Sequence, residues 1–292
     1  MSLSASLERL SNYRIKNTRA SRDIFDKGRP ILEQRLDSLG DEKWTFLEQF
    51  ALAAIDIGRL DTAEQCLNLL AVQFPDSPRV QCLEGILEET RSPANAQHFY
   101  EKLLAEDGTN GAAWKRLVAV LRRQGQIDKA VRELSEYLDT FYNDVEGWLE
   151  LADIYASCNQ YTYSLQSLSH ALLLAPQNPF YYLKAAETAY TAGDVTLALK
   201  YFLMTVDMTD DTGDKPAKDS VPTGITLRAW YGVELCTRRL QAENKLASQS
   251  ESDTAASNHL PALHKLATKM LAMAYGSKDA ATSVEATRRL LA

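Results

Sequence analysis

The stretch WLELADIYASCNQYTYSLQSLSHALLLAPQNP, residues 148–179, determines the fold. Its first half spaces apolar and aromatic residues three and four positions apart, which predicts one face of a helix: Trp148, Leu151, Ala152 and Tyr155. After a short polar break, a second helical face carries Ser164, Leu168 and Ala171, and Pro176 ends it because proline cannot continue a helix. The small residues Ala152 and Ser164 lie where two antiparallel helices must approach closely. The stretch therefore predicts a pair of packed helices.

These positions recur at a fixed period along the middle of the chain. Trp148 corresponds to Trp114 before it and to Tyr182 after it. The small residue of the second helix recurs as Ala96, Ala130, Ser164 and Ala198, and the large residue four positions later as Tyr100, Leu134, Leu168 and Phe202. This layout resembles the tetratricopeptide repeat. It predicts an all-α solenoid of about five helix pairs, flanked by further helices at both ends.

Four regions are expected along the chain. Residues 1–40 predict N-terminal helices at about 5–18 and 20–38, and residues 41–209 predict the repeat array. Residues 210–224 are predicted to form a solvated loop. Residues 225–292 predict a degenerate repeat and capping helices, the last two at about 260–275 and 278–291, with a serine-rich, mobile segment at 243–259.

Three local features depart from the regular pattern near the start of the array. Gly28 and Pro30 interrupt the second N-terminal helix and are expected to kink or split it. Asp41 is expected to cap the helix that follows Gly40. In the unit from about Val80 onwards, Glu84 occupies the position of a small residue.

Composition limits the class of protein. The 292 residues carry a net charge of -7, which argues against extensive nucleic-acid binding. The four cysteines are scattered singly, without a CxxC pair, which is typical of reduced thiols in a cytosolic protein. No apolar run approaches the length that spans a bilayer.

The N-terminal stretch, residues 1–30, is rich in arginine and lysine and poor in acids. A mitochondrial transit peptide has a similar composition. We favour a solvated N-terminal helix with a basic face, and contact with phospholipid headgroups or an acidic partner is a third possibility.

We find no constellation of residues that predicts catalysis, a metal site or a cofactor. The four histidines, His98, His170, His259 and His264, do not pair with cysteine or carboxylate at ligand spacing. The P-loop, GxSxG and GxGxxG motifs are absent from the sequence. The aromatic and small residues at the repeat spacing are expected to be packing residues: Trp114, Ala130, Trp148, Leu151, Ala152, Tyr155, Ala198 and Phe202.

The candidate partner-binding surface is the concave face, which the first helix of each pair lines in a helix-pair solenoid. The register assigns to it Lys115, Arg122, Arg123, Leu149, Asp153, Phe180, Leu183, Glu187 and Tyr190. The face changes from basic to mixed to apolar and aromatic, which suits one long, extended partner segment. Ordinary solvated positions would give the same residues, and both interpretations stay open for any single residue.

A familiar use of such repeats is to hold the acidic C-terminal tail of a chaperone. That clamp needs asparagine where this chain has Ala119, and Asp153 on the next first helix would repel a carboxylate. These residues disfavour a chaperone adaptor.

Several segments together resemble one family. They are LGDEKW at 39–44, ALAAIDIGRLDTAEQCL at 51–67, QFPDSPRVQCLEG at 73–85 and RELSEYLDTFYNDVEGWLELADIY at 132–155. They are similar to subunit 2 of the endoplasmic reticulum membrane protein complex. The similarity runs from about Leu39 to Asp207, weakens through 210–224 and returns loosely at Arg228–Cys236. Residues 1–30 and the serine-rich segment match poorly.

The resemblance implies a non-catalytic scaffold without a cofactor, peripheral on the cytoplasmic face of the endoplasmic reticulum membrane. It implies that the groove grips cytosolic segments of membrane-embedded subunits and that another surface carries a further cytosolic subunit. The implied complex inserts tail-anchored and multipass proteins. A soluble adaptor or cochaperone with exchangeable peptide partners is the alternative, and an enzyme with a site assembled across distant repeats is a third.

Overall fold

The computed structural model describes residues 3–209, 221–243 and 259–276. Within these ranges the chain forms helices and no β-strand, so the prediction of an all-α solenoid is confirmed. The chain divides into two units, 1–137 and 138–292, and each is described by itself.

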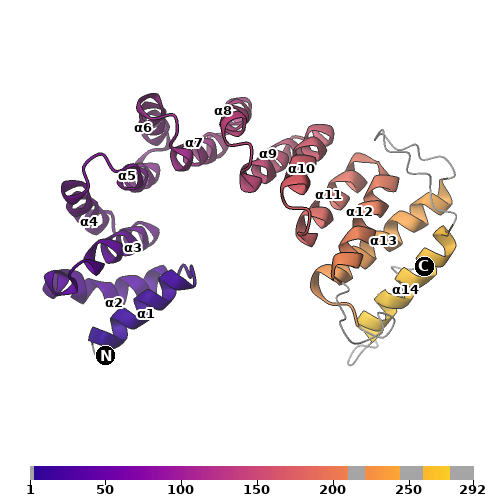
Figure 1. Cartoon of the computed structure of the whole chain (residues 1–292), viewed down its shortest axis with the longest axis horizontal. Helices are drawn as coiled ribbons and strands as arrows, with labels where there is room; N and C mark the ends of the chain where they lie inside the picture. Colours follow the sequence, from indigo (N-terminus) through magenta and orange to yellow (C-terminus); the bar gives the residue numbers. More distant parts are fainter. Residues whose placement is uncertain (1–2, 210–220, 244–258, 277–292) are drawn as a thin grey trace. The chain divides into compact units, whose positions relative to one another are not determined.

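Figure 1 shows the helices of both units in chain order. Unit 1 contains α1 (Leu3–Ile15), α2 (Ser21–Gln34), the short 3-10 helix η1 (Leu36–Leu39), α3 (Glu42–Asp56), α4 (Leu60–Gln73), α5 (Pro78–Arg91), α6 (Pro93–Glu106), α7 (Gly111–Arg123) and most of α8 (Ile127–Thr140). Unit 2 contains α9 (Val145–Ser157), α10 (Tyr161–Leu174), α11 (Pro179–Ala192), α12 (Val195–Thr209), α13 (Gly224–Ala242) and α14 (Leu260–Gly276).

One type of turn joins the two helices of the regular pairs. Gly125, Asn159 and Gly193, which occupy the same position in successive repeats, have φ angles of 74°, 60° and 92°. The amide of the residue after each turn donates to a carbonyl five residues earlier, as from Gln160 to Tyr155 at 2.9 Å. This left-handed turn with its backward hydrogen bond satisfies carbonyl groups at the helix end. Asn159 replaces glycine because asparagine tolerates the left-handed conformation.

Small side chains set the close approach within each pair. Ala63, Ala96, Ala130, Ser164 and Ala198 are each at most 1% exposed. The Ser164 hydroxyl donates to the carbonyl oxygen of Ala152 at 2.9 Å, which joins α10 directly to the backbone of α9. A larger side chain at these positions would push the two helices apart.

The pair formed by α5 and α6 corrects the sequence register. The sequence register placed Glu84 where the other repeats have a small residue. In the structure Gly85 occupies that position, and a Cβ atom on Gly85 would lie 2.4 Å from the Tyr100 ring. Tyr100 is fully buried and donates its hydroxyl to Glu89 at 2.8 Å, and burial raises the pKa of Tyr100. The register therefore shifts by one residue in this pair.

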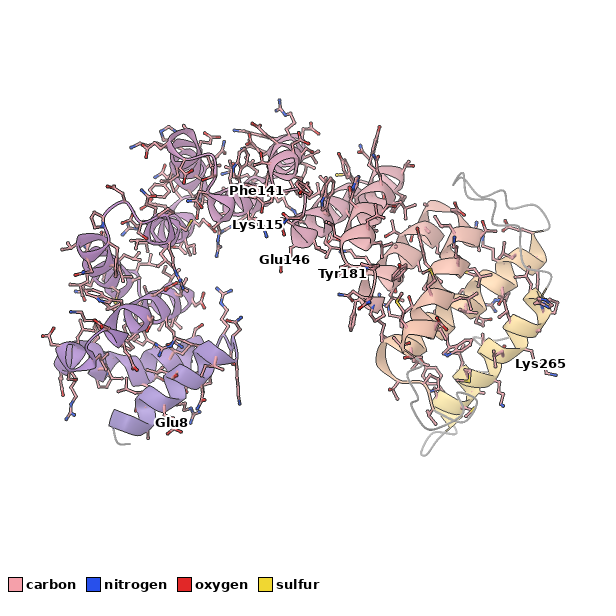
Figure 2. All side chains as sticks on the ribbon, viewed as in Figure 1. Glu8, Lys115, Phe141, Glu146, Tyr181 and Lys265 are labelled. Atoms are coloured by element: carbon pink, nitrogen blue, oxygen red, sulfur yellow. The ribbon has the colours of Figure 1, made fainter. Side chains whose placement is uncertain are left out.

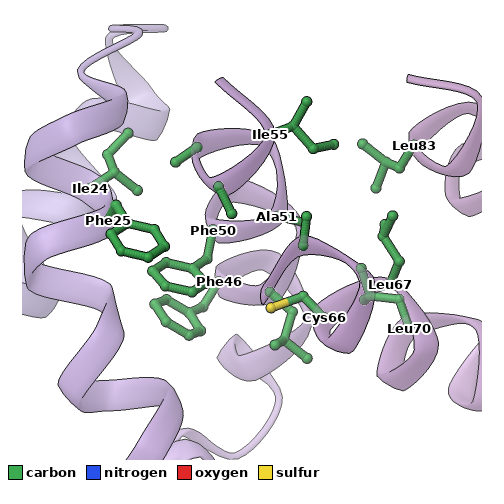
Figure 3. Packing of buried hydrophobic residues seen from close by; sticks show 14 of the residues in the cluster. Ile24, Phe25, Phe46, Phe50, Ala51, Ile55, Cys66, Leu67, Leu70 and Leu83 are labelled. Carbon is green, nitrogen blue, oxygen red and sulfur yellow. The ribbon is translucent and has the colours of Figure 1, made fainter. Parts of the chain in front are cut away.

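The N-terminal helices pack onto the first repeat of unit 1 (Figure 3). The Phe25 ring of α2 stacks on Phe50 of α3, with 5.2 Å between ring centroids. Leu10 of α1 is 1% exposed within the same hydrophobic cluster. Helix α2 continues through Pro30, so the expectation that it splits there is wrong. Asp41 occupies the N-cap position of α3 as expected, but its side chain makes no capping hydrogen bond.

The core of unit 2 is formed by α11, α12, α13 and α14. Its buried residues include Phe202 of α12, Trp230 of α13 and Leu271 of α14. Helix α13 follows the non-helical residues 221–223, and α14 begins and ends within a residue of the expected bounds. The expected loop over 210–220, the serine-rich segment over 244–258 and the helix at 278–291 lie outside the described residues.

Candidate functional site

The expected groove residues differ in exposure. In α7, Arg122 and Arg123 are exposed and Lys115 is half-buried; in α9, Asp153 is exposed and Leu149 is half-buried. In α11, Phe180 is 63% exposed, and Glu187 and Tyr190 are half-buried. Figure 2 marks Lys115 in unit 1 and Tyr181, next to Phe180, in unit 2.

Leu183 departs from the expectation of an exposed groove position. Its side chain is 6% exposed and belongs to the cluster that contains Trp230 and Val233 of α13. Helix α13 packs against α11 as well as α12, and this contact covers the face that the register assigned to a partner. The sequence could not place α13 because residues 210–224 interrupt the period.

Ion pairs connect the first helices of successive pairs, each with the acid on the earlier helix. In unit 1, Glu48 of α3 pairs with Arg79 of α5 at 2.7 Å. In unit 2, Asp153 of α9 pairs with Lys184 of α11 at 2.7 Å. In both cases the acid and the base are separated in sequence by nearly one repeat period, because the helices that carry them are neighbours in the array.

Two further expected groove residues have partners on α13. Both carboxylate oxygens of Glu187 accept from Arg228, at 2.5 and 2.9 Å. The Arg239 guanidinium lies 5.7 Å from the centre of the Tyr190 ring. Exposed ion pairs of this kind contribute little stability, but they neutralise charges that a partner would otherwise meet. Sequence reasoning missed both contacts, because Arg228 and Arg239 follow the interruption at 210–224 and lie outside the repeat period. The ion pairs between successive first helices did carry a signal, since each acid is followed by a base about one period later.

The expected packing residues fall into two groups. Ala130, Leu151, Ala152, Ala198 and Phe202 are at most 5% exposed. The other three, Trp114, Trp148 and Tyr155, are half-buried.

The two tryptophans make the same contact one repeat apart. Each indole N–H donates to the carbonyl six residues earlier, from Trp114 to Gly108 at 3.0 Å and from Trp148 to Tyr142 at 2.8 Å. Trp148 also stacks on His170 of α10, with 4.2 Å between ring centroids. The repeated tryptophan thus secures the loop that precedes its helix.

Much of the basic N-terminal stretch is paired within unit 1. Asp23 accepts from Tyr13 and from Lys27, and its contact with Arg9 is 3.1 Å. The hydrogen bonds from Lys27 and Tyr13 lower the pKa of Asp23. Arg19 reaches from the turn after α1 to Asp56 at the end of α3. These contacts tie the basic residues to the fold.

A large hollow lies in unit 1, between the turn joining α1 to α2 and helices α3, α5 and α7. Its volume is about 730 Å³. Arg14, Arg19, Arg79 and Arg116 line it, together with Glu42, Glu48 and Asp56. We call it the arginine pocket. The hydrogen bond from Arg19 lowers the pKa of Asp56, and Ser21 adds a second hydrogen bond at 2.5 Å.

A smaller hollow of about 230 Å³ adjoins it. Most of its lining is apolar: Trp44, Leu70, Phe74, Val80 and Leu83. The Trp44 and Phe74 rings meet edge to face, with 5.3 Å between centroids. We call it the apolar hollow.

Within the described residues, no group of three or more histidine, cysteine, aspartate or glutamate side chains could hold a metal ion. Burial raises the pKa of the Cys66 and Cys236 thiols to about 12, so neither forms a thiolate readily near neutral pH. In the same ranges, no helix combines the length and apolar character needed to cross a membrane.

Comparison with known proteins places these features in a family. A family model described as the EMC2 TPR-like repeat domain matches residues 68–209. ER membrane protein complex subunit 2-B of Xenopus laevis is 31% identical over 97% of this chain and 92% of its own length. TPR repeat protein oca3 of Schizosaccharomyces pombe is 31% identical over 70% of each chain.

Solved structures agree on the fold. The C-terminal part of a TPR repeat-containing protein from Cytophaga hutchinsonii superposes with a TM-score of 0.59, over 97% of this chain and 98% of that one. The two sequences are only 13% identical, so this similarity concerns the fold alone. The likeness to the Xenopus protein along nearly the whole of both chains is the decisive finding: this chain belongs to the ER membrane protein complex subunit 2 family.

Proposed function

We propose that this chain is a non-catalytic scaffold subunit of an endoplasmic reticulum membrane protein complex. In this proposal it is peripheral, on the cytoplasmic face of the membrane, and grips cytosolic segments of membrane-embedded subunits. A further cytosolic subunit binds another of its surfaces. It thereby supports insertion of tail-anchored and multipass membrane proteins.

One observation carries the proposal. The similarity to ER membrane protein complex subunit 2-B covers 97% of this chain and 92% of the relative, rather than the repeats alone. Tetratricopeptide repeats are widespread, so the repeat pattern by itself would not choose this function. The agreement includes the N-terminal and C-terminal helices that flank the repeats.

The geometry suits an assembly role. A preformed helical surface can order a tail that is disordered alone, and its rigidity confines the entropy loss to the tail. In unit 1, Arg122 and Arg123 are exposed on α7, and in unit 2, Phe180 is exposed at the start of α11. These residues, with Lys115, Leu149 and Asp153, remain our candidates for partner contact.

The soluble adaptor or cochaperone remains the alternative. It would bind exchangeable peptides weakly and would be stable as a free monomer. The pairing of Asp153 with Lys184 reduces the repulsion that a carboxylate tail would meet there. However, Ala119 still lacks the amide that a carboxylate clamp needs at that position.

The test is purification of the tagged chain from cells in mild detergent, with mass spectrometry of the recovered proteins. Near-stoichiometric recovery of several endoplasmic reticulum membrane proteins is expected. Recovery of soluble chaperones alone, or of no stoichiometric partner, would overturn the proposal.

A further inference from the structure

The arginine pocket and the apolar hollow are two parts of one surface in unit 1. They share three lining residues, Thr45, Glu48 and Arg79. The ion pair between Glu48 and Arg79 therefore forms the ridge between them. A ligand that crosses this ridge meets guanidinium groups on one side and a Trp–Phe pair on the other.

Two carboxylates of the arginine pocket already have partners. Asp56 accepts hydrogen bonds from Arg19 and Ser21, and Glu48 accepts from Arg79 at 2.7 Å. Their charges therefore offset those of two of the four arginines.

The other two arginines are less engaged. Arg116 lies 3.7 Å from Glu89, which is beyond hydrogen-bond distance, and Glu89 already accepts from Tyr100. Arg14 pairs with no carboxylate among the described residues. Arg14 and Arg116 can thus donate to an incoming anion.

The apolar hollow offers a matching anchor site. Phe74, the residue after the end of α4, is 40% exposed, and its ring packs against Trp44. Leu70, Val80 and Leu83 complete the lining. Burying a large apolar side chain here would remove exposed aromatic surface from water, which stabilises a complex.

We propose that this surface binds a peptide segment that has an acidic side chain next to a large apolar one. The carboxylate lies between Arg14 and Arg116, and the apolar side chain fills the hollow beside Trp44 and Phe74. This inference deepens the proposed function, because it states the chemistry of one partner segment.

The pocket favours a peptide over a phospholipid headgroup. Three carboxylates line it beside the four arginines, so its net positive charge is small and suits one carboxylate better than a surface dense in phosphate. A peptide supplies one such carboxylate, and its backbone N–H groups can donate to carboxylate oxygens of the pocket. The apolar hollow also suits a single side chain at a fixed distance from that carboxylate.

The probe is a fluorescein-labelled dodecapeptide, Gly-Ser-Gly-Glu-Asp-Leu-Phe-Asp-Gly-Ser-Gly-Ser, titrated with the full chain and followed by fluorescence anisotropy. Saturable binding in the micromolar range is expected. Arg116→Gln and Arg14→Gln should each weaken binding about tenfold or more, because each removes a charge-assisted contact. Lys102→Gln is the matched control, since Lys102 lies on α6 with its side chain 71% exposed, outside both hollows, and it should change nothing.

Two variant peptides separate the parts of the surface. In the first peptide, Gln and Asn replace Glu and Asp, and Arg116→Gln should no longer weaken its binding. In the second peptide, Gly-Gly replaces Leu-Phe, and Phe74→Ala should not weaken its binding. Far-UV circular dichroism of each protein variant verifies folding. If both arginine variants bind the acidic peptide as the wild type does, or if the peptide does not bind at all, the inference is overturned.

Vesicles of phosphatidylserine and phosphatidylcholine provide the competing ligand. Sedimentation with these vesicles that depends on Arg14 and Arg116, without peptide binding, would assign the surface to lipid and refute the peptide proposal. The cell purification described above is independent of this assay. Recovery of the membrane complex without peptide binding would refute the peptide site and support the proposed function. Peptide binding without recovery of the membrane complex would refute the proposed function and support the peptide site.

Discussion

The contact between Phe202 and Gly232 allows a sharp test of the packing in unit 2. Helix α13 presents Gly232 to the Phe202 ring of α12, and a Cβ atom at Gly232 would lie 2.4 Å from two atoms of that ring. Real Cβ atoms essentially never approach other atoms below 3.0 Å, so Gly232→Ala must displace the ring or the helix.

Two opposing terms set the expected magnitude. Overpacking a filled core costs about 1–3 kcal/mol. Alanine inside a helix is more favourable than glycine by about 1 kcal/mol. Gly232→Ala should therefore destabilise the wild type by roughly 0–2 kcal/mol.

The sign should reverse once the ring is removed. Phe202→Ala alone should cost about 3–5 kcal/mol, because Phe202 is 4% exposed in the core. In that background the added methyl group meets no ring, so Gly232→Ala should stabilise by up to about 1 kcal/mol through helix propensity. The coupling between the two sites should be about 1–3 kcal/mol.

Urea unfolding of the four proteins, followed by far-UV circular dichroism, measures this cycle. Gly108→Ala is the control, since its nearest neighbour would lie 3.7 Å away, an ordinary contact in unit 1. It should have the same effect with or without Phe202. If Gly232→Ala has the same sign and size in both backgrounds, the reasoning about this contact is wrong.

Three further predictions follow from other parts of the chain. Trp148→Ala should cost about 2–3 kcal/mol in urea unfolding, less than for a fully buried aromatic, because Trp148 is half-buried but loses its stacking on His170 and its hydrogen bond. Reversing the charge at Arg122 and Arg123 should leave unfolding unchanged within about 0.5 kcal/mol and weaken co-purification of membrane subunits. Pairing with Arg19 lowers the pKa of Asp56 in the folded protein. This pairing therefore stabilises the fold fully above the pKa of an unfolded aspartate, about 3.9, and the stabilisation is lost as the pH falls through the lower pKa of the folded state. Arg19→Gln should reduce the dependence of the free energy of unfolding on pH in that acidic range.

Each of these has an outcome that contradicts it. A urea-unfolding curve of Trp148→Ala that coincides with that of the wild type would refute the role of the tryptophan in securing its loop. Undiminished recovery of membrane subunits after reversal at Arg122 and Arg123 would remove α7 from the partner surface. An unchanged acid profile in Arg19→Gln would show that Asp56 gains nothing from Arg19 in the folded state.

The repeat architecture could be predicted because its determinants are local. The turn at Asn159, the tryptophan at Trp148 and the small residue at Ser164 each act within one helix pair. They recur at a fixed period, so one unit predicts the next. The predicted register was wrong by one residue at Gly85. Only the contact with Tyr100 reveals which residue of this helix must be small.

The sequence by itself determined the helix pairs, their turns and the family of the chain. The tertiary structure alone decided which of the expected groove residues are available to a partner. Helix α13 buries Leu183 and pairs Glu187 with Arg228, and the turn after α1 brings Arg14 and Arg19 to the same pocket as Arg116. These contacts join residues far apart in the sequence and outside the repeat period, so no local pattern encodes them.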